Sequence, residues 1–378
     1  MDISKFISGN YLSQYQYQSF QPTKINLEWI ISQPDINTLL EEANLKIGSL
    51  DAFSLIVPDV GTFIKMHMVK EATKSSRIEG TQTQIEDAVL KERDINPEKK
   101  DDWQEVQNYI EAMSFAIGKL DELPLSNRLL RQTHETLLKG VRGKHKQPGE
   151  FRKSQNWIGG TSLKDAVFIP PVQNEVADLM SDLEKFLNNE TINVPHLIRI
   201  AIAHYQFETI HPFLDGNGRL GRLLITLYLV KQNILHKPTL YLSDFFEKHK
   251  GLYYDNLMLV RKNNDLTQWI KFFLVAVIET AQSGSNTFRD VLSLREDIEG
   301  KRIIRLGRKL PLAKELLFYL YKKPVVTALD VEEDLKISKP TANAILKNFQ
   351  QIGILKEQTG YKRNRIFIFE EYLRLFER

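Results

Sequence analysis

Residues 209–222, TIHPFLDGNGRLGR, place one histidine, one acid, one asparagine, three glycines and two arginines between two apolar segments. Glycine lets a backbone approach a ligand closely and adopt positive φ. An apolar helix is expected from Leu220 to Lys231, and the free N–H groups and dipole of a first helical turn favour an anion. The stretch therefore predicts an anion-binding loop between two helices.

The charged residues of this loop indicate the chemistry. Arg219 and Arg222 are three positions apart, so on a helix they share a face and can hold one polyphosphate. Asp215 lies just upstream, where a phosphate-bound Mg²⁺ requires a carboxylate. His211 opens the loop and is suited to take a proton near neutral pH. Together these residues predict phosphoryl or nucleotidyl transfer.

Composition limits the classes of protein to consider. The 378 residues suffice for two or three domains, and 42% hydrophobic and 26% charged residues are typical of a soluble globular protein. Cysteine is absent, which excludes disulfides, thiolate metal sites and cysteine nucleophiles. No signal-peptide pattern and no apolar run of about 18 residues occur, so we expect a cytoplasmic protein without membrane contact.

Apolar spacing predicts an almost wholly helical chain up to about residue 290. Helices are expected at 37–51, 61–80, 101–119, 126–138, 172–188, 195–209, 220–231, 244–260 and 266–281. Residues 15–25 are expected to form an extended arm. The long loop 140–171 is typical of a functional segment, and we expect a short hairpin in it near Trp157 and 167–169.

A basic module follows a predicted soft boundary near Gly284. Residues 301–378 carry 17 lysines and arginines against 9 acids. Helical patterns at 310–321, 328–335 and 339–351 precede an alternating segment that reads as a β-hairpin, which is the order of a winged helix-turn-helix. We expect three parts: an N-terminal helical region, 1–100, a core, 101–283, and a winged domain, 295–378.

Two uses of this winged domain stay open. Ser338 is expected to cap its third helix, with Pro340 in the first turn. The polar side chains of that helix could face a DNA groove, with TGYKRNR, 359–365, as the wing. The alternative is a protein-contact module. The candidate groove-facing residues are Lys339, Thr341, Asn343 and Lys347.

The segment HPFLDGNGRLGR, 211–222, resembles the Fic-domain signature H-P-F-x-[D/E]-G-N-G-R-x-x-R at every specified position. The resemblance implies a mainly α fold with a small β-hairpin flap. It also implies an enzyme that moves AMP from MgATP to a Ser, Thr or Tyr hydroxyl of a protein, including itself. His211 would be the base and Asp215 the Mg²⁺ ligand. The phosphate loop would be Gly216, Asn217 and Gly218, followed by Arg219 and by Arg222 near the γ-phosphate. A kinase branch carries lysine in place of Gly218.

A second motif, SSRIEG at 75–80, resembles the family's inhibitory helix through Ser75, Glu79 and Gly80. The resemblance implies that Glu79 pairs with Arg222 and keeps the triphosphate out, because a carboxylate there competes for the arginine and repels the phosphate.

The remaining similarities are carried by single segments. DAVFIPP, 165–171, resembles the flap that holds a target by strand addition, with Val167, Phe168 and Ile169 as its centre. Tyr253 or Tyr254 resembles the family's adenine contact. Arg261 stands where the family has asparagine. The resemblance therefore does not assign the residue that contacts adenine on that side of the pocket. The order of the N-terminal region, the core and the winged C-terminus is similar to that of Fic proteins of the Shewanella type. Because such relatives often self-associate, a homodimer stays an open alternative.

Two other functions stay open. One is the reverse enzyme, a de-AMPylase in which Glu79 helps to activate water. The other is a nucleotide-sensing DNA-binding regulator. His204 precedes His211 by two helical turns among apolar neighbours, and we interpret it as a core histidine.

Overall fold

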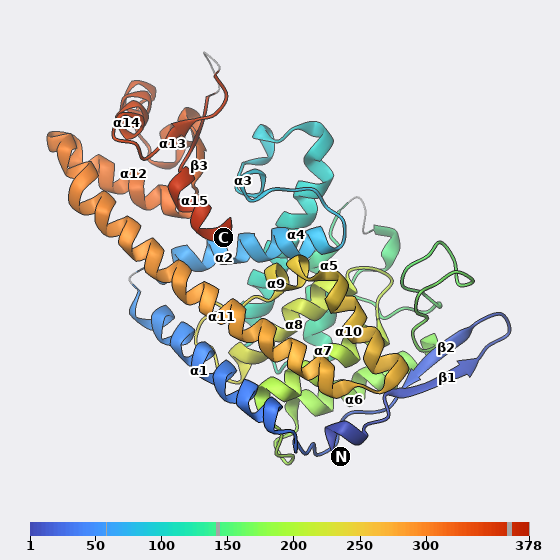
Figure 1. Ribbon diagram of the computed structural model, residues 1–378. Coiled ribbons are helices and arrows are strands. Elements are labelled where there is room, and N and C mark those ends of the chain that lie inside the picture. The colour runs from blue at the N-terminus through green and yellow to red at the C-terminus, as the bar shows by residue number, and fades with distance from the viewer. Residues whose placement is uncertain (58, 141–143, 361–364, 378) are drawn as a thin grey trace.

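The computed structural model describes residues 1–57, 59–140, 144–360 and 365–377, and helices dominate it (Figure 1). At its centre lie α7, His196–Ile210, and α8, Asn217–Lys231, which pack against each other. Both are buried along almost their whole length, as expected of helices enclosed by others. The predicted mainly α core is confirmed, and it places the loop 211–216 between its two most buried helices.

Other helices surround this pair. They are α1, Pro34–Ile56; α2, Val60–Ile78; α3, Ile85–Ala88; α4, Lys100–Lys119; α5, Asn127–Leu137; α6, Val176–Asn188; α9, Ser243–Lys248; α10, Lys250–Asn263; and α11, Leu266–Asp297. Short 3-10 turns lie at Ile3–Lys5, Glu92–Asp94, Pro97–Lys99, Lys144–Lys146 and Gln173–Glu175. The single helix expected at 244–260 is wrong, because the chain breaks at His249 between α9 and α10.

The predicted soft boundary near Gly284 is also wrong as local structure. Helix α11 runs unbroken through this residue and lies along α1 (Figure 1). An added Cβ on Gly284 would lie 3.0 Å from Leu50, so this glycine allows close helix packing and does not interrupt the helix. The chain turns only later, through a π turn, Ile298–Arg302, and a 3-10 turn, Ile303–Lys309.

The C-terminal part has the three predicted helices, a small sheet whose first strand lies between the first two of them, and a last helix, α15, that was not predicted. The helices are α12, Leu310–Lys322; α13, Ala328–Asp334; α14, Lys339–Gln351; and α15, Glu370–Glu377. The strands β3, Val325–Thr327, β4, Lys356–Glu357, and β5, Ile366–Ile368, form an antiparallel sheet in the order β3-β5-β4. Ser338 caps α14 as predicted. Residues 361–364 of the predicted wing lie outside the described residues.

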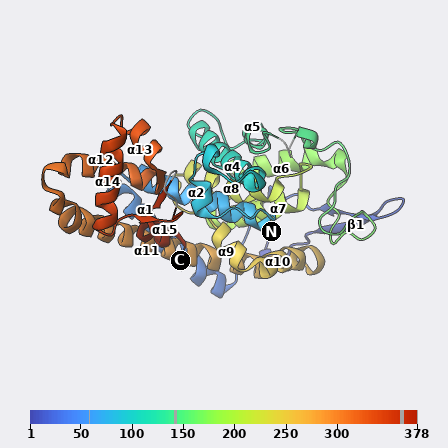
Figure 2. The same ribbon diagram turned by 90° about the horizontal axis from the view of Figure 1, so that it is seen from above.

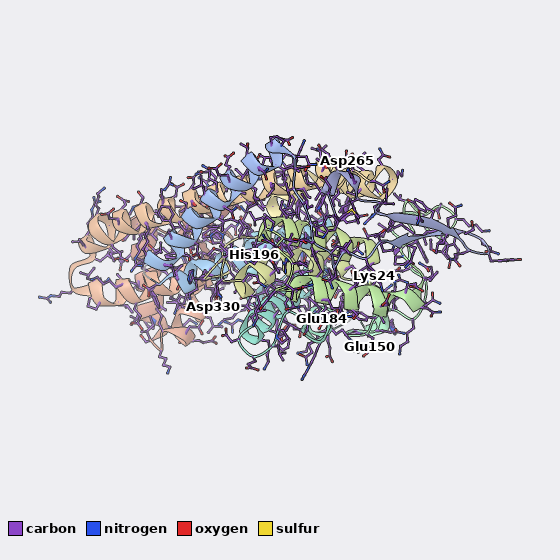
Figure 3. All side chains as sticks on the ribbon, turned by 90° about the horizontal axis from the view of Figure 1, so that it is seen from below. Lys24, Glu150, Glu184, His196, Asp265 and Asp330 are labelled. Atoms are coloured by element: carbon purple, nitrogen blue, oxygen red, sulfur yellow. The ribbon has the colours of Figure 1, made fainter. Side chains whose placement is uncertain are left out.

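This C-terminal part packs on α2. Phe63 of α2 makes ring contacts with Tyr321 and Tyr372, and His67 lies edge-on to Phe376 of α15. Figure 3 places Asp330 of α13 in the half of the molecule opposite to Lys24 and Glu150. The helix that carries the predicted inhibitory motif therefore joins the C-terminal module to the core.

The expected extended N-terminal arm is instead a hairpin. Strands β1, Gly9–Ser13, and β2, Gln18–Pro22, pair antiparallel and project from the end of the molecule away from the C-terminal module (Figures 1 and 2). The Phe20 N–H donates to the Ile169 carbonyl at 2.9 Å. This bond attaches the hairpin to the predicted flap. Among the helices of the described residues, none combines the length and the apolar run needed to cross a membrane.

Candidate active site

The loop between α7 and α8 is shaped by two left-handed residues. His211 ends α7 with φ 49°, and Gly216 opens α8 with φ 74°. Left-handed backbone costs glycine nothing but is uncommon for other residues. The strained histidine is held by its surroundings, which is typical of residues at functional sites.

Asn217 fixes the loop from inside. Its side-chain amide accepts from the Phe213 N–H at 2.9 Å and donates to the Phe213 carbonyl at 2.8 Å. The Asn156 amide also donates to the Phe213 carbonyl. Because both polar atoms of the Asn217 side chain are used, only its backbone N–H at the start of α8 is available to a phosphate. Sequence reasoning assigned Asn217 to the phosphate loop but did not predict that its side chain binds the backbone of Phe213.

His134 of α5 supports the same loop from outside. Its ring stacks on Phe213 with centroids 3.8 Å apart, and its Nε2 lies 2.9 Å from the Asp215 carbonyl. Its Nδ1 accepts from the Gly149 N–H, so Nε2 must donate and the ring is neutral. Burial lowers the pKa of His134 to about 4.

Arg152 holds the backbone of His211. Its Nε donates to the His211 carbonyl at 3.0 Å, and its Nη2 donates to the carbonyls of Ile210 and Pro171. Arg152 is 2% exposed. Sequence reasoning missed His134, Arg152 and Asn156, because they lie 55 or more residues from the loop residues that they contact, and nothing local marks them.

The imidazole of His211 is held in its neutral form. Burial and the nearby guanidinium groups of Arg261 and Arg152 lower its pKa to about 3. Its Nδ1 is buried and has no hydrogen-bond partner among the described residues. The ring is therefore neutral at physiological pH, as a general base must be.

Arg222 is bound to α2 and to the residue that ends it. Its Nε donates to Ser75 Oγ at 2.9 Å, and its Nη2 donates to the Ser75 carbonyl at 3.0 Å and to Glu79 Oε1 at 2.6 Å. Burial opposes ionisation of Glu79, but the Arg222 guanidinium holds the pKa of this carboxyl below its usual value. The structure thus brings Ser75 and Glu79 of the first motif into contact with Arg222 of the second, as the resemblance implied for Glu79 and Arg222.

Two glycines make this contact feasible. Gly80 ends α2 with φ 111°, which turns the chain away directly after Glu79. An added Cβ on Gly218 would overlap Glu79 Oε1 and lie 2.9 Å from Arg222 Nη1. The absence of a side chain at 218 is therefore what lets the carboxylate reach the arginine.

Arg219 also meets carboxylates. Its Nη1 lies 3.3 Å from Glu105 of α4, and its Nη2 lies 3.8 Å from Asp215. A cavity of about 250 Å³ opens beside them, lined by Glu79, Glu105 and Asp215 among others. Glu105 has no motif around it, and sequence reasoning did not select it.

The metal assignment depends on Asp215. Its carboxylate is half-exposed in this cavity and accepts from the Gly216 N–H at 2.6 Å. In the part of the chain that the structure describes, no three His, Asp or Glu residues cluster as a metal cage. One exposed carboxylate fits Mg²⁺ that arrives with a nucleotide, since this ion takes its other ligands from phosphates and water.

The predicted flap hairpin is reduced to a single bridge between Ile158 and Phe168. The ladder stops there because Gly159 and Gly160 turn the chain with φ 68° and 72°. Phe168 is buried under Arg261, whose guanidinium lies 3.9 Å from the ring centre, while Val167 is 65% exposed. The flap therefore presents Val167 to solvent, and the Ile169 carbonyl is occupied by β2.

The two tyrosines of α10 differ in exposure. Tyr253 is buried, and its hydroxyl lies 2.9 Å from His204 Nε2, while His204 Nδ1 lies 2.9 Å from the Gly221 carbonyl. His204 is thus a satisfied core histidine, as interpreted. Tyr254 is 38% exposed. Of the pair, Tyr254 has the surface to meet an adenine ring.

Arg261 of α10 binds the C-terminal end of α7. Its Nε donates to Thr209 Oγ1 and its Nη2 to the Glu208 carbonyl, both at 3.1 Å. Glu208 itself is a buried carboxyl that sequence reasoning did not select. Burial raises the pKa of Glu208 to about 7, although Arg222 opposes this shift.

Sequence comparison places these residues in a family. The profile of the Fic/DOC family matches residues 124–229, and that of the Fic/DOC family N-terminal region matches residues 37–118. The chain belongs to the Fic/DOC family. All residues of the 211–222 loop lie inside the first match, and Ser75, Glu79 and Gly80 lie inside the second.

Curated relatives of this Fic chain share its central part. The protein adenylyltransferase Fic of Culex quinquefasciatus is 36% identical over 125 residues, and those of Drosophila erecta and Aedes aegypti are 34% identical over 125 residues. Each match covers 33% of this chain and 22% of the relative, so the chain matches about a fifth of the length of these proteins.

Solved structures share the fold. A Fic family protein from Desulfovibrio desulfuricans, 22% identical, matches with a TM-score of 0.54 over 89% of this chain and 96% of its own. A Fic-domain signaling protein from Bacteroides thetaiotaomicron, 17% identical, matches with a TM-score of 0.54 over 66% of this chain and 97% of its own. The Fic fold of the core is thereby shown.

Proposed function

We propose that this Fic protein is a protein adenylyltransferase that transfers AMP from ATP to a protein hydroxyl and that Glu79 holds it in an inhibited state. The proposal is supported by the names of the curated relatives and by the neutral, backbone-clamped His211 beside an anion-binding helix start. The observation that carries the inhibition is the 2.6 Å contact between Arg222 and Glu79.

In the proposed reaction, each charged or titratable residue of the loop has its own role. His211 accepts the proton of the target hydroxyl while the hydroxyl oxygen attacks the α-phosphorus, and the bond to the β-phosphate breaks to release pyrophosphate. Asp215 would hold Mg²⁺, which supplies charge neutralisation at the phosphates. Arg219 and Arg222 would bind the triphosphate once Glu105 and Glu79 give way. Catalysis then consists of positioning and charge stabilisation.

The target would enter along the flap. Val167 is exposed, and a target segment could pair with the backbone there while Arg152 and Asn156 keep His211 in register. Because such pairing reads backbone, it places little demand on the target sequence. Tyr254 would contact the adenine at the other end of the site.

The test is label transfer from ATP labelled at the α- or the γ-phosphate into a lysate and into the enzyme itself. Wild type, Glu79→Gly, His211→Ala and the control Glu98→Gly, an exposed acid outside the site, are compared. We expect α-label only, raised by Glu79→Gly, unchanged by Glu98→Gly and abolished by His211→Ala. Transfer of γ-label, or α-label transfer that survives His211→Ala, would contradict the proposal.

The reverse reaction has one observation in its favour. The Glu79 carboxylate is ionised and lines the same cavity as Asp215, where it could orient a water toward a bound AMP-protein. Loss of AMP removal in Glu79→Gln, with transfer retained, would support a de-AMPylase.

A further inference from the structure

Helix α14 and the helix before it have the arrangement of a helix-turn-helix. Helices α13 and α14 pack against each other and are joined by the four residues 335–338. Lys336 in this turn has a left-handed backbone, with φ 53°, and turns of this motif often contain glycine for that reason. In DNA-binding proteins with this motif, the second helix lies in the major groove.

The outward face of α14 is polar and uncovered. Four apolar side chains of the helix are buried: Ala342, Ile345, Leu346 and Phe349. The exposed positions are Lys339, Pro340, Thr341, Ala344, Lys347 and Gln351. In both views of the ribbon, α14 lies farther from the core than α13 (Figures 1 and 2). Within the described part of the chain, no large hydrophobic side chain is exposed on α14, whereas protein interfaces are typically centred on such side chains.

Basic residues gather on and around this helix. Residues 335–356 contain four lysines and no acid, and among the described residues only the last of these lysines, Lys356, is paired with a carboxylate. Lys309, in the turn before α12, donates to the side chain of Asn348 at 2.9 Å. Arg365, at the start of β5, donates to the side chain of Asn343 at 3.4 Å. Both neighbours of α14 therefore add positive charge to its surroundings.

Acids of α13 are held on the side that faces the core. Asp330 lies 2.9 Å from Arg93, and Asp334 lies 3.4 Å from Lys91. Both basic partners belong to the segment between α3 and α4. The negative charge of α13 is thus matched by the core, and α14 carries none of its own.

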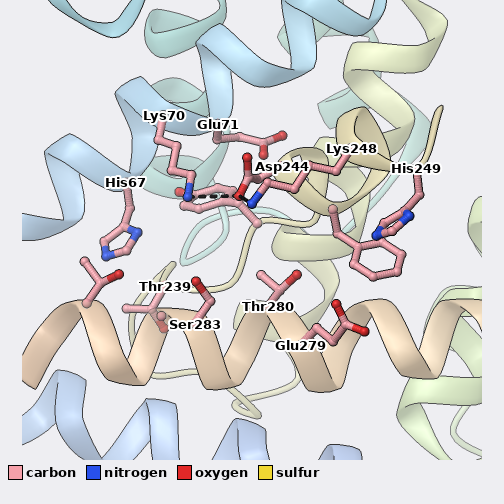
Figure 4. A pocket seen from close by; sticks show the side chains of 14 residues that line it. His67, Lys70, Glu71, Thr239, Asp244, Lys248, His249, Glu279, Thr280 and Ser283 are labelled. Carbon is pink, nitrogen blue, oxygen red and sulfur yellow. Dashed lines mark ion pairs between the residues drawn. The ribbon is translucent and has the colours of Figure 1, made fainter. Parts of the chain in front are cut away.

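Lysines that cluster inside the core are matched by acids in the same way. Figure 4 shows Lys70 and Lys248 at the carboxylate of Asp244, and each ammonium lies 3.0 Å from it. Two further acids line the same pocket. That pocket has no positive charge to spare for an anion, whereas Lys339 and Lys347 have no acid beside them in their helix.

We propose that α14 binds duplex DNA in the major groove, with Lys339 and Lys347 on the phosphates beside it. The major groove of B-DNA is about 12 Å wide and admits an α-helix, whereas the major groove of duplex RNA is too narrow. Single strands are bound largely by stacking on aromatic side chains, and α14 exposes none. This proposal goes beyond the AMP transfer proposed above and does not rest on it.

Fluorescence anisotropy of a labelled mixed-sequence DNA duplex tests the binding. The full-length wild type is compared with Lys339→Gln/Lys347→Gln and with the control Lys65→Gln/Lys262→Gln, which removes the same charge from exposed positions of the core. We expect affinity at about 0.1 M salt to fall about tenfold or more in the α14 variant, and its salt dependence to lose about two phosphate contacts. The control should keep both the affinity and the salt dependence of the wild type.

A second pair of variants leaves every lysine in place. Ala344→Asp puts a negative charge on the exposed face of α14, and Ala52→Asp puts the same charge on the exposed surface of α1. We expect the first substitution to abolish DNA binding and the second to leave it near the wild-type value. Because both positions are exposed, urea unfolding should give each variant the stability of the wild type.

Four results would overturn the proposal. They are no binding by the wild type, equal affinity of the wild type and the α14 variants, an equal loss in the two controls, and RNA duplex bound as tightly as DNA. Polyglutamate bound as tightly as the DNA duplex would instead make this surface a site for acidic proteins. None of these measurements uses label transfer, so their outcome is independent of whether the chain transfers AMP.

Discussion

Gly218 and Glu79 lie so close that an added Cβ on the glycine would overlap the Oε1 of the carboxylate. The contact between Glu79 and Arg222 therefore depends on two positions 139 residues apart, one in each motif. Arg222 donates to Glu79 across the same gap, which makes the glycine, the acid and the arginine one packed unit.

A double-mutant cycle should reveal this unit. We expect Gly218→Ala to destabilise the wild type, because overpacking costs about 1–3 kcal/mol, and to cost less in Glu79→Gly, where the overlapping atom is gone. Urea unfolding of the four proteins measures both costs. Equal costs in the two backgrounds would show that Glu79 does not occupy this place in solution.

Glu105 should act as a second obstacle to ATP. Its carboxylate lies 3.3 Å from Arg219, so a triphosphate must displace it or accept its repulsion. We expect Glu79→Gly/Glu105→Gln to bind ATP about 2–10-fold more tightly than Glu79→Gly, which corresponds to an interaction of about 0.4–1.4 kcal/mol. Calorimetry measures the difference, and Glu98→Gln in the same background is the control. Weaker ATP binding in the Glu105 variant would instead make this acid a positioning partner of Arg219.

His134 should position the catalytic loop without touching the substrate. In His134→Phe the stacking on Phe213 remains, but the bonds to Asp215 and Gly149 are lost, each at about 1–3 kcal/mol for the partner left unpaired. We expect kcat to fall more than KM for ATP rises, when both are measured in the Glu79→Gly background. An unchanged kcat in a folded variant would remove His134 from the catalytic machinery.

Stability should increase with pH between about pH 4 and 6.5. Burial lowers the pKa of His67, His204 and His211 to about 3 and that of His134 to about 4, against 6.5 for an ordinary histidine. In this window the unfolded chain binds more protons than the folded one, so the free energy of unfolding rises by up to about 1.4 kcal/mol per pH unit for each histidine.

Glu208 opposes this trend. Its raised pKa of about 7 means that the folded state holds a proton which the unfolded state has released, so its contribution to stability is lost as pH rises through 7. Glu208→Gln should therefore steepen the rise of stability with pH above about pH 4.5. Urea unfolding at pH 4.5, 5.5 and 6.5 measures both slopes, and a stability that falls with pH in this range would contradict the assignment of neutral buried histidines.

Local patterns sufficed for the helices and for the loop. The apolar spacing of α4, α7 and α14 predicted their existence, and Ser338 predicted a helix start by its capping chemistry. The N-terminal hairpin was missed because its strands pair only with each other and with Ile169, which no local signal shows. The break at His249 was missed because apolar spacing continues across it.

By itself, the sequence determined the order of most helices, and it predicted the chemistry of the 211–222 loop and the pairing of two motifs. Such features depend on residue types and on short spacings along the chain, and both can be read from the sequence. Only the tertiary structure decided that Arg152 and His134 hold the loop, that Glu105 meets Arg219, and that Tyr254 rather than Tyr253 is exposed. Such contacts join residues far apart in the chain, and their partners are set by how the helices pack.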